Sequence, residues 1–420
     1  MPPPATAALV DLQLRIVPAI AEIGAATWDG CANPRIGDIL QPNSEKKAAN
    51  QSIEEDISYN PFISYDFLYS LEASGSATAR TGWQPQHVVA EAPQGGVLGV
   101  VPCYLKSHSR GEYVFDRGWA EAYERAGGQY YPKLQVSVPF TPATGRRLLV
   151  RPSPDAVRMR AALTAGLIEL CRRHDTSSVH FTFLPEAECR ELVEHGFLHR
   201  TDQQFHWENA GYATFEAFLE ALSARKRKTI RRERREALAA GVTVHWLTGR
   251  DLTEEVWDAF FEFYMETGSR KWGRPYLNRK FYSLIGERMA DRIVLVMAKR
   301  AGRWIAGAIN FIGSDTLFGR HWGAIEHHPF LHFEVCYYQA IDFAIAHGLK
   351  RVEAGAQGEH KLARGYMPTT THSAHYIADP GLRRAVADYL TRERAYVQEA
   401  GKELAALAPF RKDLIEQEQD

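Results

Sequence analysis

Apolar and polar positions follow the clearest order between residues 315 and 355, where they predict a strand, a helix and a second strand. The apolar strand 315–324 ends in a polar turn rich in His and Glu. Apolar residues then recur at helical spacing from Leu331 until Gly348, a residue that suits the left-handed conformation at a helix C-terminus. The short strand 350–355 follows. Such a crossover unit is right-handed and places its two strands parallel.

Polar clusters follow both of these strands. The turn after the first strand reads EHHPFLH, and the segment after the second reads GAQGEHKLARGY, which is dense in Gly, Glu, His, Lys and Arg. Ligands of open α/β sheets bind at the carboxyl ends of the strands, beside the helix N-terminus. We therefore expect the chemistry of the protein at this place.

The rest of the chain shows alternating strand and helix patterns. The first half predicts a strand at 11–17, a helix at 60–76, a hairpin at 87–106, a strand at 111–123, a helix at 155–174, a strand at 177–184, a helix at 186–196 and a strand at 197–207. Residues 123–154 are rich in Tyr, Pro, Thr and Arg, and we expect a loop insertion there with no core element.

The second half repeats this order of elements. The hairpin 297–313 matches the first hairpin, the strand 317–323 matches 114–120, and Gly365 and His375 match Gly196 and His206. Matched residues lie closer together along the chain in the later matches than in the earlier ones. The insertion at 123–154 accounts for this change. A shared order with several aligned residues favours an internal duplication over chance.

These patterns predict an α/β fold, α+β mixed, with two tandem copies of a mixed twisted sheet flanked by helices. The first domain spans 1–210 and is expected to bind substrate, with the loop insertion at 123–154. A basic linking helix spans 211–240, and the second domain, at 241–420, is expected to be catalytic.

The linking segment 212–241 has a continuous helical pattern. Eight of the eleven residues from Arg225 to Arg235 are Lys or Arg. One interpretation is a solvated linker helix. The other is a stripe that binds phosphates of a nucleotide sugar, a tRNA end or a cofactor, because Arg227, Arg231 and Arg235 share one helix face. The sequence leaves both open.

Composition narrows the class of protein. The 420 residues exceed one ordinary core, and 45% hydrophobic and 24% charged residues are typical of a globular protein. The formal net charge of −1 argues against a general nucleic-acid binder. Five dispersed cysteines without a CxxC pair, together with the lack of a signal peptide pattern or a membrane-span pattern, predict a reduced, cytoplasmic protein.

Several motifs carry a resemblance to a known family. The segments NPFISYDFLYSLEASGS, GWQPQH, GRHWG, LHFEVCYYQ and GAQGEHKLARGY resemble the FemAB-like family, a peptidoglycan biosynthesis/recognition family of the GNAT acyltransferase superfamily. The similarity covers nearly the whole chain. It implies a GNAT-like fold, acyl transfer to an amine, and either acyl-CoA or aminoacyl-tRNA as a co-substrate, with no tightly bound cofactor.

The chain departs from the GNAT pattern at two positions. The turn EHHPFLH lacks the Gly-rich sequence with which GNAT domains hold the phosphates of acyl-CoA, which leaves aminoacyl-tRNA as a donor. Many GNAT domains have a Tyr four residues before the Gly-aromatic pair; Lys361 stands there in the second copy and Leu192 in the first. A cation stabilises a developing oxyanion and Leu does not, so the second copy is the expected catalytic one.

We assign catalysis to the turn after the second strand. Lys361 and His360 are expected to polarise the carbonyl or stabilise charge, and Glu359 or Glu334 to act as base for the amine. Donor or cofactor binding is assigned to His328, His332, Arg227 and Arg231. A metal site at these histidines is not expected, because no third ligand stands at a fixed spacing.

Polar residues on loops are candidates for binding the acceptor substrate. This set comprises Lys106, His108, Asp116, Tyr130, Tyr131, Lys133, Trp272, Arg274, Tyr276, Arg364 and Tyr366. The tyrosines near residue 130 are equally compatible with packing over the core beneath a long loop.

The leading hypothesis is an N-acyltransferase or aminoacyltransferase that moves an acyl group from a thioester or ester donor to an amine on a small-molecule or peptide acceptor. The alternative is a non-catalytic protein that recognises a cell-wall precursor or peptide between the domains. tRNA stays open as a partner, and the sequence does not indicate the oligomeric state.

Overall fold

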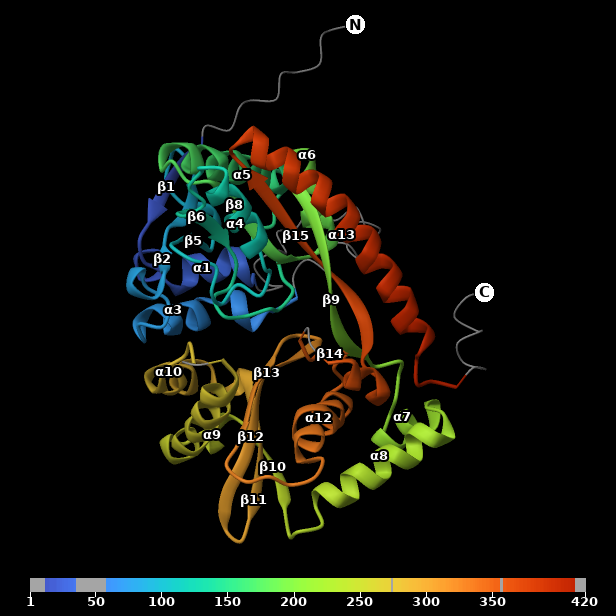
Figure 1. Cartoon of the computed structure of the whole chain (residues 1–420). Helices are drawn as coiled ribbons and strands as arrows, with labels where there is room; N and C mark the ends of the chain where they lie inside the picture. The colour runs from blue at the N-terminus through green and yellow to red at the C-terminus, as the bar shows by residue number, and fades with distance from the viewer. Residues whose placement is uncertain (1–11, 35–57, 273–274, 356–357, 412–420) are drawn as a thin grey trace, which may run out of the picture.

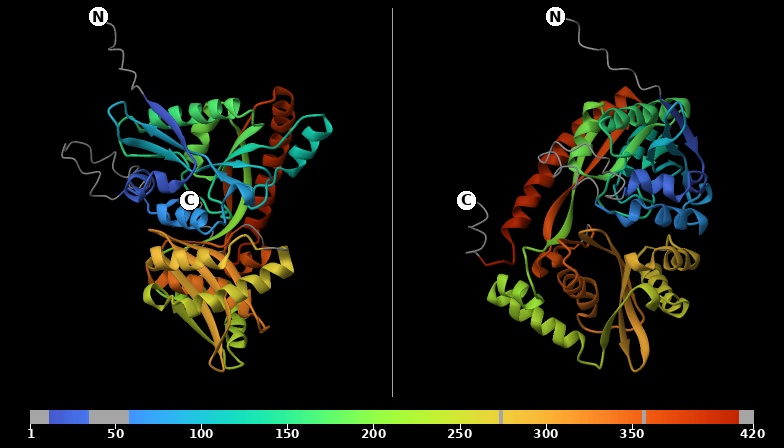
Figure 2. Two further views of the ribbon diagram at one scale, coloured as in Figure 1. Left: turned by 90° about the vertical axis from the view of Figure 1, so that its left-hand side faces the viewer. Right: turned by 180° about the vertical axis from the view of Figure 1, so that it is seen from behind.

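The computed structural model describes residues 12–34, 58–272, 275–355 and 358–411, without the side chains of 269–272 and 359. The molecule is a mixed α/β structure with two halves that lie one above the other (Figures 1 and 2). This confirms the predicted fold class of mixed sheets flanked by helices. The boundaries placed at residues 210 and 240 stay predictions.

The first half contains the elements from β1 to β9. Their bounds are β1 (Gln13–Val17), α1 (Ala25–Ala32), α3 (Tyr65–Ala73), β2 (Trp83–Pro85), β3 (His87–Glu91), β4 (Val97–Val101), β5 (Cys103–Lys106), α4 (Arg117–Arg125), β6 (Lys133–Val136), β7 (Leu149–Val150), α5 (Ala156–Arg173), β8 (Ser178–Leu184), α6 (Glu186–Glu194) and β9 (Leu198–Glu208).

The connecting helices and the second half follow. Their bounds are α7 (Phe215–Ala221), α8 (Ala224–Ala237), β10 (Thr243–Leu247), α9 (Glu254–Trp272), α10 (Arg279–Met289), β11 (Ile293–Arg300), β12 (Arg303–Ile312), β13 (Thr316–Ala324), α11 (Leu331–Phe333), the π-helical segment η7 (Glu334–Tyr338), α12 (Gln339–Ala346), β14 (Arg351–Glu353), the 3₁₀ segment η8 (Glu359–Arg364), β15 (Met367–Ile377) and α13 (Pro380–Ala406).

Two long strands exchange partners between the halves. The large sheet has the order β10-β11-β12-β13-β14-β9-β15-β8-β6-β5-β2. The last strand of the first half, β9, pairs with β14 of the second half, and β15 of the second half pairs with β8 of the first. β9 and β15 pair with each other in the middle, where Figure 1 shows them running between the halves beside α13. Strand pairing therefore joins the halves through this sheet, while β1, β3, β4 and β7 form a second sheet in the first half.

Each half contains one parallel crossover. β13 and β14 are parallel and are connected through α11, η7 and α12, as the sequence predicts for 315–355. The helix ends before Gly348, which has a φ of 65°. In the first half β6 and β8 are parallel and are connected through α5. The repeated topology supports duplication, with β6 as the counterpart of β13.

This topology corrects two sequence predictions. Residues 114–120 were expected to form a strand that matches 317–323, but the chain leaves the sheet here and begins α4 at Arg117. The segment 123–154 was expected to lack a core element, yet it supplies β6, whose four residues are all buried. Lys133 is the first residue of this buried strand. Its charge is tolerated there because it pairs with Glu112 and Asp116 on the preceding loop.

The helix expected across 212–241 is two helices. Leu222, between α7 and α8, has an extended backbone. The C-terminal segment occupies the break, where Ser223 N donates to Pro409 O at 2.9 Å and Leu222 forms a bridge with Phe410. A distant part of the chain thus interrupts a locally helical sequence.

One apolar core extends across both halves. Phe62, before α3, lies against Phe311 of β12 with a ring-centroid distance of 5.0 Å, and Phe67 of α3 lies 5.7 Å from Phe281 of α10. Burial of such aromatic pairs away from water stabilises the contact between the halves. Within the described residues, no helix combines the length and apolar character that crossing a lipid bilayer requires.

Candidate functional site

β13 and β14 separate after only three paired residues. Thr316–Phe318 pairs with Arg351–Glu353, and β13 then carries an irregularity between Gly319 and Trp322 in its pairing with β12. A bulge bends its strand and re-aims side chains. The free ends of the two parallel strands therefore diverge at the place where the sequence predicts the chemistry.

Lys361 lies in the turn η8 after β14. Its Nζ donates hydrogen bonds to Ala354 O at 2.6 Å and to Gly355 O at 3.0 Å, and the residue is only 4% exposed. Burial lowers the pKa of Lys361 to about 8. Within the described part of the chain, no ion pair joins this ammonium to a carboxylate. It is a desolvated cation held by neutral carbonyls.

His360 lies beside Lys361 among aromatic rings. Its Nε2 shares a hydrogen bond with Tyr337 Oη at 3.0 Å, and its ring stacks on Phe333 with a centroid distance of 5.6 Å. The ring of His332 is 6.3 Å away. The structure thus brings the predicted residues Lys361, His360 and His332 together. The side chain of Glu359 lies outside the described residues.

Arg364 and Tyr366 belong to the same turn. Arg364 Nη1 donates to His360 O at 2.6 Å, and its guanidinium lies 3.5 Å from the ring centroid of Phe333. Tyr366 is fully buried and donates to Tyr337 O at 3.0 Å. These contacts hold the turn against η7.

Glu334, the proposed alternative base, is fully buried in η7. It accepts hydrogen bonds from Arg234 at 3.1 and 2.9 Å and from Gln339 at 2.7 Å. Arg234 also pairs with Asp342 at 2.7 Å. The Glu334 carboxylate therefore joins α8 to η7, and its role as a base stays a prediction.

Two arginines of the basic helix face α7. Arg227 Nη1 donates to Glu220 O at 3.2 Å and Leu222 O at 3.3 Å, which caps the C-terminus of α7, while Arg231 pairs with Glu216. The structure gives both residues a part in joining α7 and α8. Donor binding by Arg227 and Arg231 stays a prediction.

A pocket of about 550 Å³ opens where β13 ends and α11 begins. Its lining is Glu266, Thr267, Trp322, Ala324, Ile325, Glu326, His327, His328, Leu331 and His332. We call it the acidic pocket. It contains both histidines assigned to the donor. His328 shares a hydrogen bond with Glu326 at 2.9 Å, and His332 lies 5.1 Å from the ring of Trp322. In the described residues no group of three or more His, Cys, Asp or Glu could hold a metal ion.

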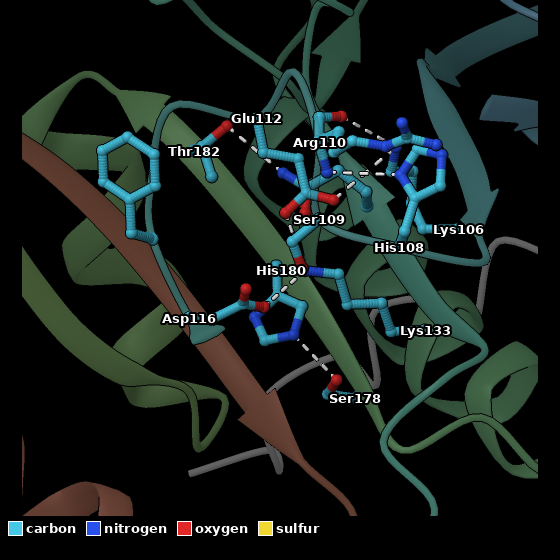
Figure 3. Close-up of polar contacts among 12 residues, drawn as sticks. Lys106, His108, Ser109, Arg110, Glu112, Asp116, Lys133, Ser178, His180 and Thr182 are labelled. Atoms are coloured by element: carbon cyan, nitrogen blue, oxygen red, sulfur yellow. Dashed lines mark hydrogen bonds and ion pairs between the residues drawn. The ribbon is translucent and has the colours of Figure 1, made fainter. Parts of the chain in front are cut away.

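Most of the first-half candidates form a buried charge cluster (Figure 3). Lys133 Nζ donates to Glu112 at 2.7 Å and to Asp116. Lys106 Nζ lies 3.7 Å from Glu112 and 3.5 Å from the ring centroid of Trp83. Three of the candidates, Lys106, Asp116 and Lys133, are therefore neighbours in space, although Lys106 and Lys133 lie on strands and not on loops. We call the set Lys106, Glu112, Asp116 and Lys133 the paired cluster.

Burial and pairing act in opposite directions in the paired cluster. Burial opposes the charge of Lys133, but Asp116 and Glu112 raise its pKa above the ordinary value. Burial likewise opposes the charge of Asp116, but Lys133 lowers its pKa. Burial lowers the pKa of Lys106 to about 7 and that of His108 to about 4. Lys106, Lys133 and Asp116 are at most 2% exposed, so the cluster is inside the protein.

A chain of hydrogen bonds leads from the paired cluster into the central sheet. Tyr130 Oη donates to Asp116 at 2.7 Å and lies 3.2 Å from His180 Nε2. His180 Nδ1 and His375 Nδ1 are 2.7 Å apart, across β8 and β15. The sequence analysis did not single out His180. Its position in a fully buried strand was a signal, but its partner His375 is 195 residues away.

Of the remaining candidates, Tyr276 contacts the other half, Tyr131 lies within the first half, and the side chains of two others belong to the part of the chain that is not described. Tyr276 stacks on Phe140 with a centroid distance of 4.9 Å, and Arg320 donates to Phe140 O. Tyr131 shares a hydrogen bond with Ser109 at 2.8 Å. Arg274 and the side chain of Trp272 lie outside the described residues.

A second polar group that the sequence analysis missed lies at the joint between β14 and β9. Glu353 and His206 are directly opposite each other in the strand register, and both are at most 5% exposed. Burial raises the pKa of Glu353 to about 7 and lowers that of His206 to about 3. Gln204, two residues before His206, donates to Pro142 O at 2.8 Å. The hydrogen bond from Gln204 links β9 to the connection between β6 and β7.

Comparison with solved structures finds several that resemble the chain at low identity. A tandem GNAT protein from the clavulanic acid biosynthesis pathway is 12% identical, with a TM-score of 0.46, over 88% of this chain and 99% of that one. FemX is 12% identical, with a TM-score of 0.49, over 75% and 93%. L-PGS from Bacillus licheniformis is 9% identical, with a TM-score of 0.48, over 80% and 97%.

No curated protein matches the sequence. The family model that matches is the FemAB-like one, described as peptidoglycan biosynthesis/recognition, and the match extends over residues 19–412. This confirms the resemblance found in the sequence motifs. The chain belongs to the FemAB-like family of peptidoglycan biosynthesis/recognition proteins.

Proposed function

We propose that this protein transfers an acyl or aminoacyl group from a thioester or ester donor to an amine. The observation that carries the proposal is Lys361, a buried cation with no paired carboxylate in the described residues, at the end of β14 where β13 diverges. Membership of a peptidoglycan biosynthesis family supports an amine acceptor of the cell-wall type, a small molecule or a peptide.

In the proposed reaction the amine nitrogen attacks the carbonyl carbon of the donor. A C–N bond forms, the carbonyl oxygen becomes an oxyanion, and the C–S or C–O bond to the leaving group then breaks. The Lys361 ammonium stabilises the oxyanion, and it does so effectively because burial has removed most of its water. Binding both substrates at one site supplies much of the rate through orientation.

The amine must lose a proton as the C–N bond forms. The Glu334 carboxylate already accepts hydrogen bonds from Arg234 and Gln339, so it is less available to accept this proton. His360 is adjacent to Lys361, and Tyr337 orients its ring. We assign proton acceptance to His360 in neutral form, with the leaving thiolate or alkoxide taking a proton from Lys361 or from water.

The test is transfer from a panel of donors, comprising acetyl-CoA, a long-chain acyl-CoA and aminoacyl-tRNA, to cell-wall nucleotide–peptide precursors. Product formation by the wild type, with a 100- to 1,000-fold loss in Lys361→Met, is the expected result for removing an oxyanion donor. The matched control is Lys402→Met, which removes a lysine that is exposed on α13. Equal transfer rates for Lys361→Met and the control would contradict the assignment of Lys361 to oxyanion stabilisation. Ligand binding without turnover of any donor would favour the alternative of a non-catalytic binding protein.

A further inference from the structure

A second pocket lies beside the turn that carries His360 and Lys361. It has a volume of about 340 Å³ and opens between α8 and η8. Its lining is Arg225, Lys226, Thr229, Ile230, Glu233, Tyr338, Ala363 and Arg364. We call it the basic pocket. Figure 1 shows α8 beside α12, on the side of the molecule that also carries α7.

The floor of the basic pocket belongs to the proposed catalytic turn. Ala363 and Arg364 are residues of η8, two and three positions after Lys361. The side chain of Arg364 is 7% exposed, and its Nε has no hydrogen-bond partner among the described residues. A buried N–H without a partner costs free energy unless a ligand or water accepts from it. The floor therefore carries the positive charge of Arg364, whose Nε–H is itself covered by protein.

The rim of the basic pocket adds two further cations. Arg225 is exposed and Lys226 half-buried, and Thr229 lies one helical turn further along α8. Glu233 is the one acidic residue of the lining. It is already neutralised, because it accepts hydrogen bonds from Arg364 at 2.8 Å and from Tyr338. The remaining charge of the lining is positive.

The acidic pocket has the opposite character. Its lining contains Glu266, Glu326 and three histidines, with neither Lys nor Arg. His332 lines the acidic pocket, and its ring lies 5.1 Å from that of Trp322 and 6.3 Å from that of His360 in the proposed catalytic turn. A group bearing two or more phosphate charges is attracted to the basic pocket, whereas the acidic pocket has no lysine or arginine in its lining and its Glu326 is already paired with Arg300 at 2.8 Å.

We propose that the basic pocket binds the phosphate groups of the acyl donor, so that the donor approaches Lys361 from the α8 side and not through the acidic pocket. The proposal rests on the proposed function and adds the place and the charge of the donor. Arg225, Lys226 and Arg364 bind the phosphates, and Thr229 is a further hydrogen-bond donor at the rim. The shared chemistry is a phosphate ester, which CoA and an RNA 3′ end both carry.

The test measures binding and needs no turnover. Inorganic pyrophosphate is titrated calorimetrically into the wild type, into Arg225→Ala/Lys226→Ala, and into the control Lys228→Ala/Arg235→Ala. The control removes two exposed cations of the same helix that do not line the pocket. We expect at least tenfold weaker binding in the first double variant and less than twofold weakening in the control. Equal weakening in both would overturn the proposal, because it would show only the general field of α8.

Competition identifies the source of the phosphate. CoA and an RNA trinucleotide ending in adenosine are each tested for displacement of pyrophosphate from the wild type, and the one that displaces it is the donor class. Displacement by neither would overturn the donor assignment. Lys361→Met should bind pyrophosphate as the wild type does, so failure of phosphate binding is distinguishable from failure of transfer at Lys361.

Discussion

Lys133 in the first half and Lys361 in the second are both buried, and their surroundings differ. Lys133 is paired with Glu112 and Asp116, while Lys361 donates to the carbonyls of Ala354 and Gly355 and, among the residues that the structure describes, forms no ion pair. Pairing raises the pKa of Lys133, although burial opposes it, and burial lowers that of Lys361 to about 8. Burial alone therefore does not identify a functional lysine.

This difference indicates which of the two buried lysines has a structural role and which one is a candidate for catalysis. A buried ion pair whose charges satisfy one another is inert, and removing one partner leaves an uncompensated charge. A buried ammonium without a counter-charge is unfavourable for folding, and such positions are typical of functional sites. The paired cluster of the first half is accordingly a structural ion-pair network, and the turn with Lys361 in the second half is where, under the proposed function, a positive charge would stabilise the reacting carbonyl.

The largest expected effect comes from breaking the paired cluster. Lys133→Met leaves Asp116 buried without this cation, while Glu112 keeps Lys106 at 3.7 Å, and should lower the free energy of unfolding by about 3–5 kcal/mol. Urea unfolding monitored by circular dichroism measures this. An unchanged midpoint would mean that the cluster is hydrated in solution and that the comparison fails.

Lys361→Met should behave differently in the same assay. It removes a buried charge that has no ion-pair partner in the described part of the chain, but it leaves two carbonyls without their donor. The two effects oppose each other, so the change in the free energy of unfolding should stay within about 1.5 kcal/mol near pH 7. The pH dependence of stability distinguishes the variant from the wild type more clearly. The unfolded chain binds a proton at Lys361 up to about pH 10.5 and the folded one only up to about 8, so wild-type stability should gain a contribution as pH rises from 8 to 10.5. Lys361→Met should lack that contribution, and a rise of equal size in the variant would contradict the low pKa.

The transfer rate should have the corresponding pH dependence. If protonated Lys361 stabilises the oxyanion, the rate falls as pH rises through about 8, by about tenfold for each unit above it. Single-turnover transfer between pH 6.5 and 10 measures this fall. Lys361→Arg, which stays charged across the range, should move the fall to higher pH or remove it, whatever its absolute rate; a fall at the same pH in this variant would assign the titration to another group.

Glu353 gives a smaller effect at the joint between the halves. Its pKa is raised by burial from 4.5 to about 7, so the folded state holds a proton that the unfolded state loses above about 4.5. Stability is therefore lost as pH rises from about 4.5 to 7. Glu353→Gln should be more stable than the wild type at pH 8, with the difference shrinking towards pH 5. Urea midpoints at both pH values check this, and a difference independent of pH would point to altered packing.

The parts of the fold that local pattern governs could be predicted from the sequence. The crossover from β13 to β14 follows from apolar spacing within 40 residues and from Gly348 at the helix end. β6 was missed because Lys133 and the tyrosines before it indicate a surface loop until their partners on another loop are known. The break between α7 and α8 was missed because Pro409 and Phe410 cause it.

The candidate site shows the same division. Lys361 and His360 stand out in a Gly-rich turn after a strand, and the structure places them together as that pattern indicates. The sequence could not show that the Glu334 carboxylate is already hydrogen-bonded, because Arg234, which binds it, is 100 residues away. The charge of the two pockets also depends on side chains from separate helices and turns, which no spacing along the chain shows.

The central comparison is tested most directly by titrating the two lysines themselves. Protein labelled with ¹³C at the ε-carbon of lysine is followed by NMR from pH 6 to 11, with Lys361→Met and Lys133→Met used to assign the signals. We expect the Lys361 signal to titrate near pH 8 and the Lys133 signal to stay protonated as long as the protein is folded. Titration of Lys361 near its ordinary value of 10.5 would contradict the account, because that lysine would then be no different from a solvated one.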